Sequence, residues 1–117
     1  MGERHTSDLT VSTASIPEGA VVIPVGDVDL SGSPMLRNEL RKAQEKRPHR
    51  IVVELGQVGY MDSTGLATLV EAMQMGRRYG TRIVLCDLRD RVKSIIEIAR
   101  LDSVFVIAAD REAARKA

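Results

Sequence analysis

The feature of the sequence that most limits its possible folds is a regular alternation of strand-like and helix-like segments. After two strand-like segments, β-branched runs alternate with stretches whose apolar residues recur at helical spacing. This order (β, β, α, β, α, β, α, β, α) favours a largely parallel sheet, because each crossover returns a strand alongside its predecessor. We therefore predict an α/β fold with a mixed, mostly parallel sheet of four to five strands packed with about four helices.

The first two strand-like segments predict an antiparallel hairpin. Residues 9–16 (LTVSTASI) alternate as a half-buried strand does, and the turn residues PEG separate them from a second strand, AVVIPVGDVDL, at 20–30. Pro24 has no N–H to donate to a neighbouring strand. We therefore expect the second strand to be bulged at Pro24 or paired there on one side only.

The later segments predict buried strands and amphipathic helices in turn. RIVVEL (50–55) and TRIVLCDL (81–88) are rich in β-branched residues, which is typical of strands covered on both faces. A last short strand is expected over 103–108. Three stretches carry apolar residues at helical spacing, and their stripes are Leu36, Leu40 and Ala43; Leu66, Leu69, Val70 and Met73; and Val92, Ile95, Ile96 and Ala99.

Capping residues predict where the helices begin and end. Ser33 followed by Pro34 indicates a helix with Ser33 as the N-cap and proline at the first helical position. Pro48 ends this helix, and Gly80 supplies the C-terminal stop of the next one. Asp110 is expected to cap a final helix over 111–117.

The composition fits one compact domain. The chain has 117 residues, of which 44% are hydrophobic, so it can bury a sizeable core. We expect a polar tail over 1–8 and a single domain over 9–117. The tail is too polar for a signal peptide, and no apolar run approaches the roughly 18 residues of a membrane span. The single Cys86 excludes an internal disulfide, so a cytoplasmic protein without membrane attachment is expected.

The charge balance argues against nucleic acid as a partner. Seventeen basic residues against sixteen acidic ones leave a net charge of +1, and two Tyr, one Phe and no Trp offer little for base stacking. Arg77, Arg78 and Arg82 surround the predicted end of the second helix. Because cations there interact favourably with the helix dipole, we prefer this interpretation to an anion site.

One short stretch, YMDSTGL at 60–66, needs a separate explanation. Three small polar residues, Asp62, Ser63 and Thr64, separate an apolar run from the helical stripe that begins at Leu66. Ser63 is expected at or next to the N-cap of this helix. An oxygen that accepts a hydrogen bond from a free backbone N–H at a helix start is worth typically about 1 kcal/mol. Capping alone is therefore a sufficient structural explanation.

The stretch lacks the surroundings of a catalytic serine. A nucleophile elbow has glycine two residues before the serine, where this chain has Met61, and the only candidates for a triad histidine are His5 and His49. Neither a P-loop nor a proper G-x-G-x-x-G pattern occurs, and two histidines and one cysteine give no metal-ligand spacing. We expect no enzyme activity, no catalytic residues, no cofactor and no metal.

The remaining interpretation is that Ser63 is itself a substrate for phosphorylation. A hydroxyl at a helix start can accept a phosphate without unfolding the domain, because the added charge of about −1.5 to −2 meets the positive end of the helix dipole. A partner docked over this point would meet a bulky dianion beside Asp62. Like-charge crowding and desolvation would then disrupt the contact.

Four motifs occur in order along the chain: G-D-V-D at 26–29, a strand that ends at 54–55, Y-M-D-S-T-G-L at 60–66, and G-T-R-I-V-L at 80–85. With this arrangement the chain resembles the STAS domains of bacterial anti-sigma factor antagonists, over about Leu9 to Ala114. The resemblance implies the STAS fold. It also implies partner switching: the unphosphorylated antagonist binds an anti-sigma factor that is also a serine kinase, and so releases a sigma factor.

In this family, phosphorylation of a serine dissolves the complex and a serine phosphatase restores it. Carried onto this chain, the phosphoacceptor is Ser63 and not Thr64. The implied partner-binding residues are Asp27, Asp29, Asp62, Ser63, Thr64 and Gly65. Gly65 would permit a close backbone approach at the helix start. On residue type alone, Asp27 and Asp29 also fit turn formation and helix capping.

A fixed role is the alternative: a STAS scaffold, or a regulatory subunit of a signalling or transport complex. The intact D-S-T-G favours the switch, since a kinase substrate needs it and a scaffold does not. As an oligomeric state we expect a monomer or weak dimer, with protein partners only.

Overall fold

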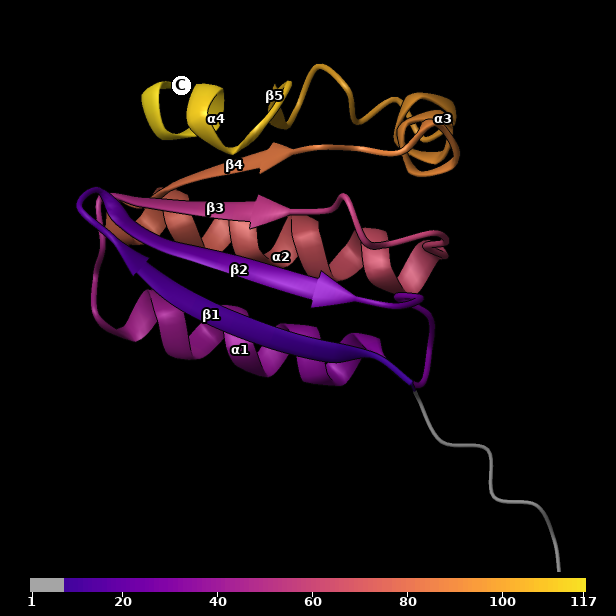
Figure 1. The fold of residues 1–117 in the computed structure, drawn as a ribbon, viewed down its shortest axis with the longest axis horizontal. Coiled ribbons are helices and arrows are strands. Elements are labelled where there is room, and N and C mark those ends of the chain that lie inside the picture. The colour runs from indigo at the N-terminus through magenta and orange to yellow at the C-terminus, as the bar shows by residue number, and fades with distance from the viewer. Residues whose placement is uncertain (1–7) are drawn as a thin grey trace, which may run out of the picture.

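The computed structural model describes residues 8–117, and a five-stranded sheet with the order β1-β2-β3-β4-β5 forms its centre (Figure 1). β1 and β2 pair in antiparallel fashion, and each later strand pairs in parallel with its predecessor. The predicted mixed sheet that opens with a hairpin is thereby confirmed. The strands are β1 (Thr10–Ile16), β2 (Gly19–Val25), β3 (Arg50–Glu54), β4 (Arg82–Cys86) and β5 (Val106–Ala108).

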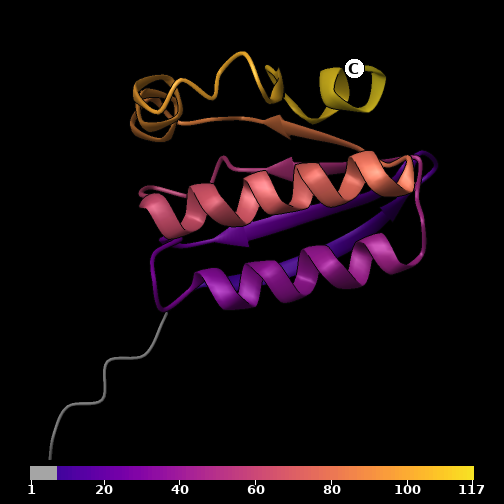
Figure 2. The ribbon, with the colours of Figure 1, turned by 180° about the vertical axis from the view of Figure 1, so that it is seen from behind.

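Four helices pack around this sheet in three different places. α1 and α2 run side by side over one face, as the view from behind shows (Figure 2). α4 packs on the opposite face, and α3 lies beyond the end of β4 (Figure 1). The helices are α1 (Ser33–Glu45), α2 (Ser63–Tyr79), α3 (Asp90–Ile98) and α4 (Arg111–Lys116).

The apolar strands are explained by burial on both faces of the sheet. In β3, Ile51 and Val53 belong to the large core that includes the stripes of α1 and α2, whereas Val52 belongs to a smaller core with Ala114 of α4. Successive side chains of a strand point to opposite faces, so two cores require a continuous apolar run. Within residues 8–117, no helix is long and apolar enough to cross a membrane.

α4 is held on the sheet by polar contacts in addition to the small core. Arg50 of β3 donates hydrogen bonds to the main-chain oxygens of Arg115 and Ala117. Arg115 in turn forms an ion pair with Glu18, at 2.9 Å, in the turn between β1 and β2. The Asp110 side chain accepts from the amide of Ala113, as predicted for a cap.

The start of α1 differs from the prediction in its capping residue. The N-cap is Gly32, so Ser33 is already helical and makes no side-chain capping bond. The carbonyl oxygen of Asp29 accepts from the amide of Ser33 at 2.8 Å, and the Asp29 carboxylate accepts from the amide of Gly32 at 3.1 Å. Asp29 therefore satisfies the two amides at which the helix opens, while the carbonyl oxygen of Gly32 accepts from the amides of Met35 and Leu36, where a capping Ser33 would have bonded.

Three smaller expectations are also resolved. Pro24 pairs with Val11 of β1, but the pairing of β2 with β3 ends at Val22, so β2 is paired on one side at the proline, as predicted. The last strand is shorter than expected and starts at Val106. α3 ends at Ile98, and Ala99, expected in the buried stripe, is the exposed C-cap.

Candidate functional site

The loop that follows β2 and the loop that follows β3 lie side by side at one end of the sheet. The amide of Val28 donates to the oxygen of Tyr60 at 3.0 Å, and the amide of Asp62 donates to the oxygen of Val28 at 3.2 Å. These bonds form a short parallel bridge between Val28 and Met61. Because adjacent parallel strands end at the same edge, residues 26–32 are brought to the start of α2.

Asp62 is the N-cap of α2. Its Oδ1 accepts from the amides of Thr64 at 2.9 Å and Gly65 at 3.2 Å, and also from the Thr64 hydroxyl at 2.5 Å. Partial burial opposes ionisation of this carboxyl, but the hydrogen bonds from Thr64 and Gly65 outweigh it and hold the pKa below its ordinary value. Asp62 is therefore an ionised cap whose charge is directed into the helix start.

Ser63 is the first residue of α2 and stands next to the cap, at the position expected from the sequence. Its side chain is exposed, and its hydroxyl makes no hydrogen bond to any residue among those the structure describes. The hydroxyl of Thr64, by contrast, is bound to Asp62. Of the two adjacent hydroxyls, only that of Ser63 is both accessible and unengaged.

Gly65 allows the loop after β2 to approach the first turn of α2. A β-carbon placed at this residue would lie 2.5 Å from Cγ of Met61, 2.7 Å from the carbonyl oxygen of Val28 and 2.9 Å from Cγ1 of Val28. Contacts this short do not occur for real β-carbons, and one of them is to main chain that cannot swing away. Any larger residue would therefore push the two loops apart.

The two aspartates of the G-D-V-D motif have different surroundings. The Asp29 carboxylate accepts from the hydroxyl of Ser31 and from the amides of Ser31 and Gly32, and these bonds lower its pKa. Asp27 is exposed, and its carboxylate has no partner within the described part of the chain. Asp29 therefore has the turn-forming role that its residue type allows, while Asp27 is available to a ligand.

An apolar groove beside Ser63 was not anticipated from the sequence. It has a volume of about 350 Å³ and is lined by Tyr60, Met61, Asp62, Ser63, Leu66, Ile95, Ile98 and Ala99. Ile98 is 82% exposed on the α3 side of the groove and Tyr60 is 40% exposed at its other end. Leu30, in the neighbouring loop, is 73% exposed. One feature of the sequence could have indicated this groove: Ile98 is apolar but lies outside the buried stripe of its predicted helix.

A second group of ligand-type side chains lies at the ends of β3 and β4. One ligand atom from each of Glu54, Cys86 and Asp87 lies within 4.8 Å of the other two. Burial, with the nearby carboxylates, raises the pKa of the Cys86 thiol to about 12, which opposes the thiolate that a metal would need. Glu54 is already paired with Arg111 at 2.6 Å. These contacts describe a structural cluster, and we assign no site to it.

A five-stranded mixed sheet packed with four helices defines this chain as a small α/β domain. The chain matches the STAS domain family over residues 11–114 and belongs to that family. BtrV of Bordetella bronchiseptica is 33% identical over 92 residues, which cover 79% of each chain. An anti-sigma-B factor antagonist of Listeria monocytogenes is 31% identical over 86 residues, covering 74% of this chain and 75% of the relative.

Solved structures show the same fold at lower sequence identity. An anti-sigma factor antagonist from Mycobacterium paratuberculosis superposes with a TM-score of 0.81 at 20% identity, covering 96% of this chain and 97% of the other. The phosphorylated form of the Bacillus cell fate determinant SpoIIAA superposes with a TM-score of 0.69 at 16% identity, covering 89% and 96%. The predicted STAS fold is thereby confirmed.

Replacing Gly65 by alanine should lower the free energy of unfolding by about 1–3 kcal/mol, because the added methyl overpacks the contact with Val28 and Met61. This loss exceeds the gain in helix propensity of up to about 1 kcal/mol. Gly59→Ala is the matched control, since its β-carbon would meet only Nη1 of Arg89, at 3.6 Å, and Oδ1 of Asp27, at 4.0 Å. Urea denaturation of both variants measures the difference, and equal stabilities would refute the packing argument.

Asp62→Ala should cost about 1 kcal/mol at neutral pH, as expected for loss of an N-cap. Because the pKa of Asp62 is lower in the folded than in the unfolded state, its stabilisation is present above the unfolded pKa. The difference between wild type and variant should therefore shrink as the pH falls through the folded pKa. Urea unfolding from about pH 7 to about pH 2 tests this. Asp27→Ala is the control at neutral pH, and it should leave the free energy of unfolding close to that of the wild type, because this carboxylate has no partner among the described residues.

Proposed function

We propose that this chain is an anti-sigma factor antagonist that binds an anti-sigma factor through the surface around Ser63. The proposal rests on one observation above all: the free Ser63 hydroxyl at the start of α2, beside an open apolar groove. The names of the Listeria monocytogenes and Mycobacterium paratuberculosis proteins support it, since both are antagonists of this kind. In this proposal the chain is a binding protein without catalytic activity of its own.

The groove supplies the apolar part of the proposed contact. An exposed apolar patch bordered by polar residues is typical of protein-binding surfaces, where a few buried anchors carry most of the binding energy. Ile98 and Tyr60 are exposed apolar residues that line the groove together with Ser63, and Leu30 is exposed in the loop after β2. Asp27 adds an accessible negative charge at the rim. A partner that covers Ser63 would therefore bury Ile98 and contact Asp27.

Phosphorylation of Ser63 is the proposed switch. Here the phosphate would lie at the first residue of α2, where the helix dipole stabilises negative charge. The neighbouring Asp62 carboxylate is already hydrogen-bonded to the helix start, so the fold tolerates the added charge. A docked partner, however, would have to desolvate a dianion at the edge of an apolar groove. In this proposal the partner is a serine kinase that modifies its own ligand, and a serine phosphatase reverses the reaction.

The charge at residue 63 should control binding without controlling folding. We expect Ser63→Ala to bind the anti-sigma factor of the same organism with near wild-type affinity and Ser63→Asp to bind at least about tenfold more weakly, a loss of about 1.4 kcal/mol. Both variants should melt close to the wild type. Calorimetric titration with a candidate anti-sigma factor measures the affinities. Mass spectrometry after incubation with that protein and ATP should find phosphate on Ser63, and phosphate on Thr64 alone would contradict the assignment.

Ile98 should be an anchor of the same contact. Ile98→Asp is expected to weaken anti-sigma factor binding by about tenfold or more, because an exposed anchor is replaced by a charge that must be desolvated. Ile107→Asp is the control, since Ile107 is also exposed, at 39%, but lies on β5 away from the groove. If both variants lost the same affinity for the anti-sigma factor, the groove would not be part of the binding surface. The role of Ser63 would still be decided by the Ser63 variants.

A further inference from the structure

Four arginines gather at the end of the sheet that is remote from Ser63. Arg77 and Arg78 lie in the last turn of α2, Arg82 begins β4, and Arg47 follows α1. All four are exposed. The guanidinium of Arg47 lies 4.0 Å from the centre of the Tyr79 ring, and the amide of Arg82 donates to the oxygen of His49, which brings the segments together. We call Arg47, Arg77, Arg78 and Arg82 the arginine end.

The positive charge of the arginine end is not compensated within residues 8–117. None of its four members takes part in an ion pair, although six other basic residues do: Arg37, Arg41, Lys42, Arg111, Arg115 and Lys116. Like charges that gather without partners repel one another and destabilise the fold. A cluster of this kind is therefore unfavourable for the isolated domain.

Structural roles account for only part of the cluster. Cations in the last turn of α2 favour its dipole, which covers Arg77 and Arg78. Arg82 lies outside the helix and stands directly opposite Arg50 in the β3–β4 register, where like charges are destabilising. Arg47 adopts a left-handed conformation with φ of 51°, which favours glycine. The contact with the Tyr79 ring explains the place of the Arg47 side chain, so Arg82 is the member that these structural roles leave unexplained.

Two members of the arginine end border a hollow with an apolar floor. The hollow has a volume of about 340 Å³ and includes Arg77 and Arg82 among its lining residues. Its apolar lining is formed by Met73, Ile83, Val104 and Val106. Val104 is 37% exposed there. The hollow therefore offers space for one apolar side chain beside Arg77 and Arg82, neither of which forms an ion pair within residues 8–117.

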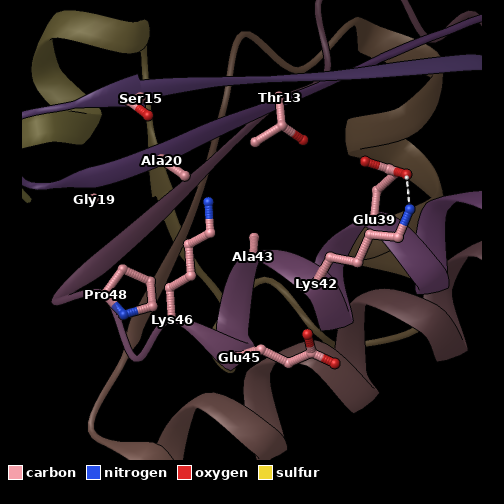
Figure 3. Close-up of a pocket in the computed structure, with 10 residues that line it drawn as sticks. All are labelled: Thr13, Ser15, Gly19, Ala20, Glu39, Lys42, Ala43, Glu45, Lys46 and Pro48. Atoms are coloured by element: carbon pink, nitrogen blue, oxygen red, sulfur yellow. Dashed lines mark hydrogen bonds and ion pairs between the residues drawn. The ribbon is translucent and has the colours of Figure 1, made fainter.

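A larger hollow lies between β1 and the end of α1, and its charged residues are not of one sign (Figure 3). It has a volume of about 480 Å³ and carries charges of both signs. Glu39 and Lys42 are paired within it at 3.4 Å, while Lys46 extends toward the strands (Figure 3). Mixed charge of this kind selects no ligand class, so we base the inference on the arginine end.

We propose that the arginine end is a second docking surface, which binds an acidic segment of a protein partner by placing one apolar side chain in the hollow and carboxylates on Arg77 and Arg82. Arginine favours this role because its planar group binds carboxylates through two hydrogen bonds. Nucleic acid fits less well, because the one aromatic ring here, Tyr79, is covered by Arg47. A membrane fits less well, because the apolar residues line a hollow and do not protrude.

The test uses a labelled synthetic peptide in which glutamates flank a single leucine, with the lysine version of the same peptide as its counterpart. Fluorescence anisotropy should show binding of the glutamate peptide that weakens as salt is raised, and no binding of the lysine peptide. Arg77→Glu combined with Arg82→Glu should weaken binding at least about tenfold. Arg91→Glu combined with Lys93→Glu, an equal charge change on exposed positions of α3, should leave it unchanged.

A second readout locates the contact. Amide chemical-shift changes should fall on residues 73–83 and 104–106 and spare 60–66, so the surface around Ser63 is not involved. Absence of binding at millimolar peptide, or shifts confined to the Ser63 end, would overturn the proposal. Tighter binding of a single-stranded oligonucleotide or of phosphatidylserine vesicles would also overturn it. Sedimentation experiments provide a last check. Self-association that the Arg77→Glu and Arg82→Glu double variant abolishes would overturn the proposal, because the occupant would then be a second copy of the chain.

Discussion

The close approach of the Val28 main chain to Gly65 holds the functional end of this protein together. Without a β-carbon at residue 65, the loop after β2 can lie against the first turn of α2 and bond to the loop after β3. That bridge sets the position of the G-D-V-D motif relative to Asp62 and Ser63. The groove depends on it as well, because Met61 and Leu66 line it and flank the same contact. The glycine thus acts through its neighbours and needs no contact with a partner.

Within Asp62, Ser63 and Thr64 the structure separates stability from recognition. Asp62 and Thr64 bond to each other and to the helix start, so their polar atoms are occupied. Ser63 contributes no such bond and faces outward. A charge added at Ser63 therefore changes what a partner meets and leaves the capping bonds intact.

The two ends of α2 differ in charge and so differ in the ligands they favour. At its start, Asp27 and the capped Asp62 stand beside exposed apolar side chains. At its end, Arg77 and Arg82, which form no ion pair with any described residue, border a hollow of similar volume. α2 spans the sheet and keeps these surfaces apart, so the two proposed partners would contact different residues. The near-neutral total charge conceals this separation, which is visible only when the residues are placed in space.

The sequence by itself determined the order of the elements, the hairpin and the candidacy of Ser63, because periodicity and turn residues act over short stretches of chain. At Pro24 it left a bulge or one-sided pairing open, and the structure decided for the latter. It misplaced the cap of α1, since Asp29 reaches the helix start through a loop conformation that residue types do not reveal. Only the tertiary structure decided which hydroxyl stays free, that Ile98 lies exposed beside Ser63, and that Arg47 joins the arginines of α2 and β4. Those properties depend on contacts between residues far apart in the chain, which local patterns do not encode.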